Sequence, residues 1–314
     1  MASILHRLPS VALGVIFGPS ISKVVDLMDG KTVLVTGGTG GIGKETARGL
    51  AARGARVILV GRDPVRAQRA ADELSAGGGR VEALAADVTR QRDLARLAAQ
   101  VAERCDRLDV LINNVGTNPP RRILTEDGVE ATFAAHVLTP FTLTRLLLPL
   151  LGGRVVNITG GIPGGPIELD NLQAERRYLG WTFSQYNHTK TMLMAMSLRF
   201  AEQEQVAGSG VTINVAYPGH GHTPMNQSMT TAGFPYVYRP IVPLLRAVTP
   251  RIFGDLSKPS RSSVYLASSD DVEGVTGTYF GRKCRRVPWP ASALDRRNQD
   301  AIWTLCEALT RETV

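Results

Sequence analysis

Short apolar runs alternate with segments of helical spacing along most of the chain. The apolar runs are largely β-branched and predict strands at residues 31–36, 56–61, 81–86, 110–113, 154–159, 211–216 and 278–281. Continuous apolar strands separated by helices are typical of a parallel sheet covered by helices on both faces. No change of composition and no internal repeat divides the chain. The sequence therefore predicts a single doubly wound α/β domain.

Three segments fall outside this alternation. Residues 1–28 are expected to be an N-terminal extension with a short helix, because their apolar stretch lacks the small-x-small cleavage site of a secretory signal. The main domain is expected to span residues 29–290. Within it, residues 219–259 contain six prolines and are expected to form a lid, because ligands of doubly wound folds bind beyond the carboxyl ends of the strands. A surface excursion without a ligand role is the alternative. Residues 291–314 are expected to carry a C-terminal helix, with helical spacing from 294 to 311.

Charge and cysteine content narrow the classes of partner. The chain has 36 Lys+Arg against 28 Asp+Glu, a net charge of +8, and its densest basic stretch is 282–286. Such an excess fits nucleic acid, an anionic membrane surface or a phosphate-bearing cofactor. No nucleic-acid motif is present, and no apolar run is long enough for stable membrane insertion. The three cysteines lack CxxC spacing, which predicts neither a disulfide framework nor a zinc site and fits a cytoplasmic protein.

A glycine-rich loop follows the first predicted strand and opens a helix. Its sequence, Thr-Gly-Gly-Thr-Gly-Gly-Ile-Gly, occupies residues 36–43. Glycines at this place permit a tight turn and let a pyrophosphate approach the free N–H groups of the helix end. The strand–loop–helix context therefore predicts a Rossmann-type dinucleotide site.

At this point the sequence resembles the short-chain dehydrogenase/reductases. The loop resembles the TGxxxGIG motif of that family, and the later matches are 113–116 with NNAG, 186–190 with YxxxK, and 218–223 with PGxxxT. Order and spacing agree over about residues 29–280. Residues 274–280 and the helix that holds Trp303 are most similar to the retinol-dehydrogenase-like branch.

The resemblance implies a set of cofactor-binding residues. They are Gly37, Thr39, Gly41, Ile42, Gly43, Asp87, Val88, Asn113, Val115, Gly116, Tyr186, Lys190, Pro218, Gly219 and Thr223. Arg62 adds a physical argument, because an arginine after the second strand accommodates a 2′-phosphate where NAD sites carry a carboxylate. Gly61 is expected to leave room for that phosphate, so NADP(H) is the expected cofactor. The alternative is that Arg62 is a solvated residue and Asp63 only caps a helix.

Tyr186 and Lys190 are the expected catalytic pair. They lie four residues apart and share one face of a helix. A neighbouring ammonium favours the phenolate, so we expect Lys190 to lower the pKa of Tyr186 toward the range of a general acid/base.

Two positions depart from the family pattern. Gly160 stands where the family has a catalytic serine, and the adjacent Thr159 is expected to face the other way along the strand. Gly160, Gly161, Gly164 and Gly165 are expected to vacate space for a bulky substrate, with Thr159, Gly160, Gly161 and His222 as substrate-binding residues.

The second departure is His136, which stands where the family has an asparagine that helps to kink a helix. Pro140 has no N–H for the carbonyl four residues earlier, so the kink is expected to survive. His136 is a candidate for proton relay or a packed histidine.

The expected function follows from these residues. It is an NADP(H)-dependent oxidoreductase of secondary metabolism that acts on a carbonyl, alcohol or quinone of a bulky hydrophobic substrate. The alternative is a non-redox cyclase, isomerase or dehydratase that retains NADP(H) structurally. The resemblance also implies a homodimer or homotetramer, although the C-terminal extension could block one interface. His188, His220 and His222 have no carboxylate or cysteine at ligand spacing, so no metal is expected.

Overall fold

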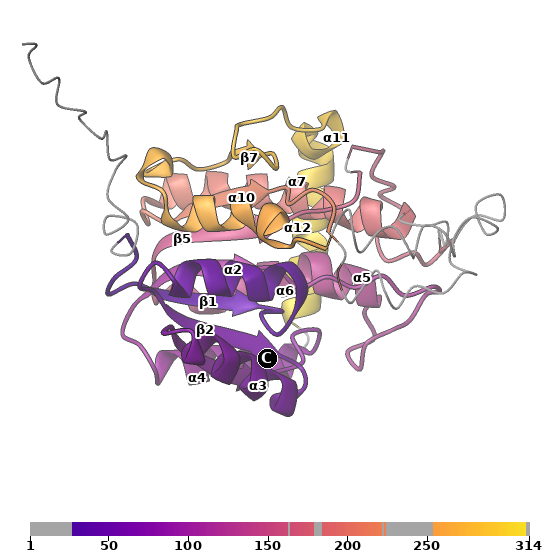
Figure 1. Ribbon diagram of the computed structural model, residues 1–314. Helices are drawn as coiled ribbons and strands as arrows, with labels where there is room; N and C mark the ends of the chain where they lie inside the picture. The colour runs from indigo at the N-terminus through magenta and orange to yellow at the C-terminus, as the bar shows by residue number, and fades with distance from the viewer. Residues whose placement is uncertain (1–26, 163, 179–183, 222, 224–253, 312–314) are drawn as a thin grey trace, which may run out of the picture.

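The fold is built on one seven-stranded parallel sheet. A computed structural model describes residues 27–162, 164–178, 184–221, 223 and 254–311. The strand order is β3-β2-β1-β4-β5-β6-β7. The strands are β1 (Thr32–Thr36), β2 (Arg56–Gly61), β3 (Arg80–Ala85), β4 (Leu108–Asn113), β5 (Leu151–Ile158), β6 (Thr212–Ala216) and β7 (Tyr279–Phe280), shown in Figure 1. The predicted doubly wound α/β domain is confirmed.

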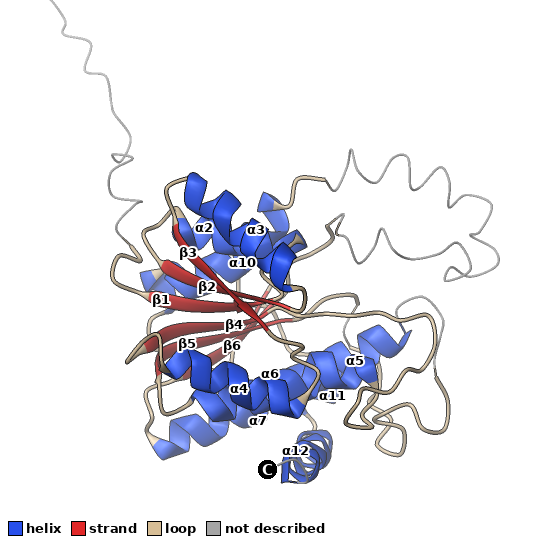
Figure 2. Ribbon diagram, turned by 90° about the horizontal axis from the view of Figure 1, so that it is seen from below, coloured by secondary structure: helices blue, strands red, loops and turns tan. Residues whose placement is uncertain are grey.

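Helices cover both faces of the sheet. Figure 2 shows α2 (Gly41–Ala51), α3 (Pro64–Ala76) and α10 (Ser257–Ser268) on one face. The other face carries α4 (Gln91–Ala102), α6 (Thr139–Leu147) and α7 (Ser184–Ala207). The short helices are α5 (Ala131–Phe133), the π-helical turn η1 (Ala134–Leu138), the 3₁₀ turn η4 (Asp270–Val272) and α11 (Ala291–Leu294). Within the described residues, no helix combines the length and apolar character that a membrane span needs.

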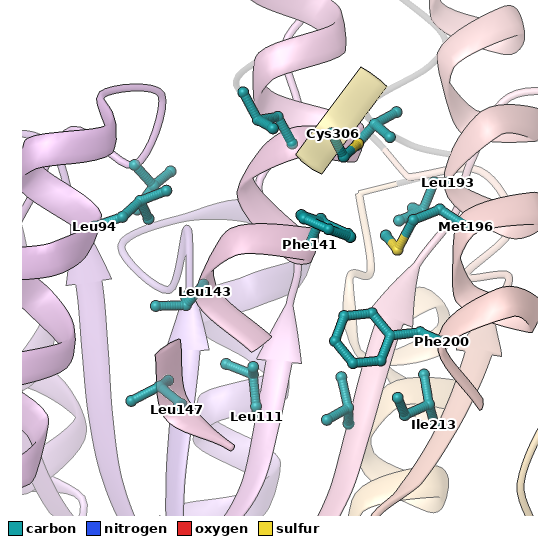
Figure 3. Close-up of a cluster of buried hydrophobic side chains, with 14 of the residues drawn as sticks. Leu94, Leu111, Phe141, Leu143, Leu147, Leu193, Met196, Phe200, Ile213 and Cys306 are labelled. Carbon is teal, nitrogen blue, oxygen red and sulfur yellow. The ribbon is translucent and has the colours of Figure 1, made fainter. Parts of the chain in front are cut away.

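Two hydrophobic clusters lie on opposite faces of the sheet. Alternation along each strand assigns Leu34 and Ile58 to one cluster and Val33 and Val57 to the other. The cluster beneath α6 and α7 is the larger, and Figure 3 shows Phe141 and Phe200 inside it.

The C-terminal helix α12 (Arg296–Arg311) completes the larger cluster. Its Trp303 ring meets Phe141 and Phe200 edge-on, with ring centroids 4.8 and 5.2 Å apart. The helix therefore holds α6 and α7 together from outside the sheet.

The structure corrects the expectation of one continuous helix from residue 294. The chain leaves the helical conformation at Asp295, which has φ −65° and ψ 117°, and separates α11 from α12. The Asp295 carboxylate accepts a hydrogen bond from the Arg297 N–H at 2.9 Å and so caps the start of α12. β5 also begins earlier than predicted, because Leu151 pairs with Leu108 of β4, and Gly152 and Gly153 lie at the irregularity between this pair and the pairing of Arg154 with Val110. The expected N-terminal helix and most of the expected lid lie outside the described residues.

Candidate active site

The glycine-rich loop after β1 is shaped to admit a phosphate. Gly37 and Gly41 have φ of +66° and +57°, and a Cβ atom at Gly43 would overlap the Asn114 side chain. The N-cap of α2 is Gly40, which offers no side-chain hydrogen bond to the first N–H groups of the helix. Unpaired N–H groups at a helix start are suited to bind an anion. The loop therefore fits the pyrophosphate of a dinucleotide.

Asn114 fixes the loop against the neighbouring strand β4. Its side-chain amide donates to the carbonyl oxygens of Thr36 and Gly37 at 3.1 and 3.3 Å, and its backbone N–H donates to the Thr36 hydroxyl at 3.0 Å. Asn113, the residue predicted for the cofactor, is instead buried and donates to Asn157 in β5 at 2.8 Å. Adjacent residues at a strand end face opposite ways, and only Asn114 faces the loop. The sequence analysis did not select Asn114, although two consecutive asparagines at a strand end mean that one of them faces the loop.

Two adjoining hollows run along the carboxyl ends of the strands. One has a volume of about 630 Å³ and extends from the glycine loop past β2 and β3, and the other, of about 270 Å³, extends from the same loop to β5. They share Gly37, Thr39, Arg66, Val115 and Gly116. We call the two together the groove. The structure brings these predicted residues to it: Gly37, Thr39, Gly41, Ile42, Arg62, Asp87, Val88, Val115, Gly116, Thr159, Tyr186, Lys190 and Thr223.

The end of β2 differs from the expected arrangement in one respect. A Cβ atom at Gly61 would overlap the Thr39 methyl group, so the missing side chain makes room for Thr39 rather than for a ligand. Asp63 accepts hydrogen bonds from the Val65 and Arg66 N–H groups at 2.9 and 3.2 Å and caps α3. Its carboxylate is thus already used by the helix.

Arg62 and Arg66 both line the groove beside this cap. Both are exposed, and neither forms an ion pair with any residue that the structure describes. Arg66 was missed by sequence reasoning, although its place one turn into the helix after Arg62 puts the two on the same rim.

Tyr186 and Lys190 lie together at the β5 end of the groove. Both side chains are buried, and the Lys190 Nζ donates to the Ile158 carbonyl at 2.8 Å and lies 5.9 Å from the centre of the Tyr186 ring. Burial lowers the pKa of Lys190 to about 7. Burial, with the nearby Tyr217, raises the pKa of Tyr186 above the usual value for a phenol.

The expectation that Lys190 lowers the Tyr186 pKa is therefore wrong for this state of the protein. Removal from water disfavours the charged form of each group and is the largest cause of both pKa shifts. The phenol is protonated at neutral pH, which makes it a proton donor.

The space expected to be vacant at Gly160 and Gly161 is filled. A Cβ atom at Gly160 would lie 2.5 Å from the Tyr186 Oη, and one at Gly161 would overlap the Asn187 side chain. Gly165, by contrast, has nothing within 4 Å of such an atom. The Tyr186 hydroxyl therefore occupies the place that a serine side chain at 160 would need.

Two side chains hold the turn that follows β5. The Tyr217 hydroxyl donates to the Gly161 carbonyl at 3.1 Å, and Asn187 accepts from the Ile162 N–H at 3.0 Å. Thr159 lines the groove beside them. It is buried, and its hydroxyl has no hydrogen-bond partner among the described residues.

His136 is packed beneath the catalytic pair. Its Nε2 accepts from the Thr117 N–H at 3.1 Å, so the proton is on Nδ1, which donates to the Thr189 hydroxyl at 2.7 Å. Burial and the charge of Lys190 hold its pKa well below 6.5. A neutral imidazole with both nitrogens bound favours the packed histidine over the relay.

The helix that carries His136 has the expected irregularity. It runs through η1, where the Thr139 N–H donates to the carbonyl of Ala134, five residues earlier. Pro140 follows directly and has no N–H to donate.

The remaining predicted residues lie away from the groove or outside the described residues. Gly43 packs on Asn114, and Pro218 and Gly219 follow β6. His188 accepts from the Glu168 N–H at 3.0 Å, and His220 is exposed. His222 is not among the described residues. No group of three metal-ligating side chains is found in the part of the chain that the structure describes.

Comparison with known proteins gives consistent matches. The family model for short chain dehydrogenase matches residues 31–169. Retinol dehydrogenase 14 of Mus musculus is 33% identical over 302 residues, which cover 90% of this chain and 86% of that protein. A Streptomyces protein named "Putative daunorubicin C-13 ketoreductase DnrU" is 29% identical over 91% of this chain and 94% of its own length. The solved structure described as "Pseudomonas aeruginosa RhlG/NADP active-site complex" has a TM-score of 0.61 at 26% identity and covers 82% of this chain and 96% of that one.

Proposed function

Because the chain belongs to the short-chain dehydrogenase/reductase family of oxidoreductases, with retinol dehydrogenases among its relatives, we propose that it is an NADP(H)-dependent reductase of a bulky hydrophobic carbonyl compound. One observation carries the proposed direction: the phenol of Tyr186 is buried at the end of the groove beside Lys190, and burial, which raises its pKa, favours the protonated form. A protonated phenol can give a proton to a carbonyl oxygen, whereas oxidation of an alcohol needs the phenolate as base.

The rim after β2 supports NADP(H) over NAD(H). Asp63, the nearest carboxylate after that strand, is committed to the cap of α3, and Arg62 and Arg66 face the groove as exposed cations. A guanidinium matches the geometry of a 2′-phosphate. When bound, NADP(H) supplies the hydride.

The cofactor preference is tested by dissociation constants for NADPH and NADH. Arg62→Ala and Arg66→Ala should each weaken NADPH binding by about tenfold, while NADH binding changes little, because one charge-assisted contact is lost. Arg297→Ala removes an exposed arginine from α12 and serves as the control. Equal weakening of both cofactors would refute the 2′-phosphate assignment.

The residues at the β5 end of the groove are each proposed to have a separate role in the reduction. Reduction adds a hydride to the carbonyl carbon and a proton to its oxygen, and Tyr186 gives that proton. The family resemblance implies that Lys190 holds the ribose of the cofactor. We propose that it also replaces the proton that Tyr186 gives up. Thr159 lines the same hollow, and we propose that its buried hydroxyl, which has no partner among the described residues, turns toward the substrate and donates a second hydrogen bond in place of the missing serine.

The names of two relatives support the substrate class. One is named for retinol and one for daunorubicin, so both names refer to bulky, largely hydrophobic molecules. We propose a polycyclic ketone or quinone of secondary metabolism as the substrate here.

The redox assignment is tested with NADPH and a panel of polycyclic ketones and quinones. We expect stoichiometric loss of NADPH absorbance and a product heavier by two hydrogens. Tyr186→Phe should lower kcat/KM by about 10² to 10⁴ fold. Tyr265→Phe, which removes a phenol from α10 on the opposite face of the sheet, is the matched control. Product formation without NADPH consumption would instead support a non-redox cyclase or isomerase.

The role of Thr159 is tested by a pair of variants. Thr159→Val keeps the shape of the side chain and should lower kcat by about 10² fold, whereas Thr159→Ser keeps the hydroxyl and should retain most activity. Equal activity of the two variants would remove Thr159 from the mechanism.

A further inference from the structure

The turn that follows β7 brings an arginine beside the segment that follows β6. The residues after β6 and β7 run side by side, since the Tyr217 N–H donates to the Phe280 carbonyl at 2.8 Å. Arg282 lies across Gly219, where an added Cβ atom would be 3.4 Å from the Arg282 Cδ. Its guanidinium is close enough to Tyr217 to oppose the rise that burial causes in the pKa of that phenol.

The charge of this turn is not neutralised within the described residues. Arg282, Lys283, Arg285 and Arg286 are all exposed, and none of them forms an ion pair with another residue that the structure describes. Most arginines elsewhere on the described surface, such as Arg154 and Arg177, do have acidic partners. Four adjacent cations without partners attract an anion from outside the chain.

The cofactor phosphates are too far away to be that anion. In the strand order β3-β2-β1-β4-β5-β6-β7, four strand spacings separate β1 from β7. At about 4.8 Å per spacing, the turn lies about 19 Å from the glycine loop along the sheet. Its near neighbour is instead Tyr217, whose hydroxyl rests on Gly161, next to the Tyr186 phenol. A ligand that extended from Arg282 to Tyr186 would therefore approach the phenol from the β7 side of the sheet, opposite the glycine loop.

We propose that Arg282 binds a carboxylate on the substrate, remote from the carbonyl that is reduced. This inference rests on the proposed reductase function and narrows its substrate class from a hydrophobic ketone to a hydrophobic keto acid. Arg282 can form a paired contact with a carboxylate through its planar guanidinium. Since its side chain packs on Gly219, part of its freedom is already lost before the ligand binds.

The proposal is tested with dehydrocholate, which has three ring ketones and one carboxylate, and with its methyl ester. In the wild type we expect a lower KM for the acid than for the ester. Arg282→Gln should raise the KM for the acid by about tenfold, with kcat within about twofold and the ester unaffected, because only the charge-assisted contact is lost. The KM for the acid, but not for the ester, should also rise with added salt.

Arg286→Gln is the matched control, because it removes the same charge from the same turn without contact to Gly219. It should change the KM for the acid much less than Arg282→Gln does. Equal effects of the two variants, or an equal effect of Arg282→Gln on acid and ester, would overturn the assignment.

If the wild type reduces neither compound, the reductase proposal fails for these ketones, and the carboxylate site is judged by binding alone. Calorimetric titration of cholate into the NADP⁺-loaded protein should then show binding that Arg282→Gln removes and Arg286→Gln retains. The absence of cholate binding, or binding unchanged in Arg282→Gln, would overturn the carboxylate site.

Discussion

At the scale of single residues, Gly160 and Tyr186 form one coupled feature. The Tyr186 Oη lies where the side chain of a residue at 160 would begin, 2.5 Å from an added Cβ atom. The phenol can therefore take its present position only because residue 160 has no side chain. The same turn is held by Tyr217 and Asn187, so it cannot retreat without loss of two hydrogen bonds.

Gly160→Ser should consequently impair the protein rather than restore a familiar active site. The added side chain must displace the phenol or the turn, and such overpacking costs about 1–3 kcal/mol. We expect a lower Tm and a fall in kcat, measured by thermal unfolding and steady-state kinetics. Gly165→Ser is the matched control, because Gly165 has open space around it. A rise in kcat in Gly160→Ser would contradict this account.

Lys190 gives the second prediction at this scale. Its pKa of about 7 means that it is charged below pH 7 and loses its charge above it. An anionic cofactor binds better to the charged form, so the dissociation constant for NADPH should rise as the pH goes from 7 to 9. Fluorescence titration measures this directly. Lys190→Met should bind NADPH more weakly, with little change over the same range, and a flat profile in the wild type would disprove the role of its charge.

Sequence motifs located these residues but not their surroundings. The spacing of Tyr186 and Lys190 correctly predicted that they lie together in one hollow. It could not predict their protonation, because the burial that sets it comes from elements distant in sequence. The sequence also could not show that the Thr39 methyl group fills the space beside Gly61, because this contact joins the loop after β1 to the end of β2.

At the scale of elements, α12 determines how firmly α6 and α7 are held. Those two helices support the site, since α6 continues from the π-turn of His136 and α7 carries Tyr186 and Lys190. Trp303 connects them through its contacts with Phe141 and Phe200.

Trp303→Ala should lower the free energy of unfolding by about 3–5 kcal/mol, because it leaves a large cavity between two buried rings. Urea unfolding followed by circular dichroism gives this value. Thr304→Ala, at the next and exposed position of the helix, should change stability by less than about 0.5 kcal/mol. A small loss in Trp303→Ala would show that α12 is not needed to hold α6 and α7.

The sequence predicted the elements correctly where the apolar pattern was continuous. It failed where the boundary of an element depends on a single capping side chain or on strand pairing next to two glycines. The central strands of the parallel sheet were predicted because they are buried on both faces. The break between α11 and α12 depends on the single cap at Asp295, and the early start of β5 depends on pairing of Leu151 with Leu108. Neither is visible as a change in hydrophobic spacing.

At the scale of the whole molecule, some of the positive charge is concentrated at the two ends of the candidate active site. Arginines without partners in the described structure lie at both ends of the site, Arg62 and Arg66 beside the groove and Arg282 near Tyr217. Most of the other arginines form ion pairs, as those of α4 and α7 do. Part of the net charge of +8 therefore lies where anionic ligands are expected, and exposed arginines such as Arg121 and Arg297 carry further charge without ion pairs elsewhere on the described surface.

Buried bases also make the stability of the whole molecule depend on pH in a defined direction. His136, His188 and Lys190 all have a pKa lowered by burial, so the unfolded chain binds more protons than the folded one. Stability therefore falls as the pH drops below 6.5, where the histidines of the unfolded chain become charged. Between about 7 and 10.5, Lys190 makes stability rise with pH. Burial has the opposite effect on Cys306, whose raised pKa removes stability above pH 9.

These terms together predict stability that rises from the acid side through pH 7 to a maximum near pH 9, where the thiol of Cys306 begins to oppose the effect of Lys190. Urea unfolding at pH 7, 6 and 5 measures the acid limb. His136→Asn should make that limb shallower even though it lowers stability at pH 7, because it removes the most deeply buried imidazole but also its two hydrogen bonds. His220→Asn, which replaces an exposed imidazole, is the matched control. An unaltered slope in His136→Asn would mean that the acid lability arises elsewhere in the fold.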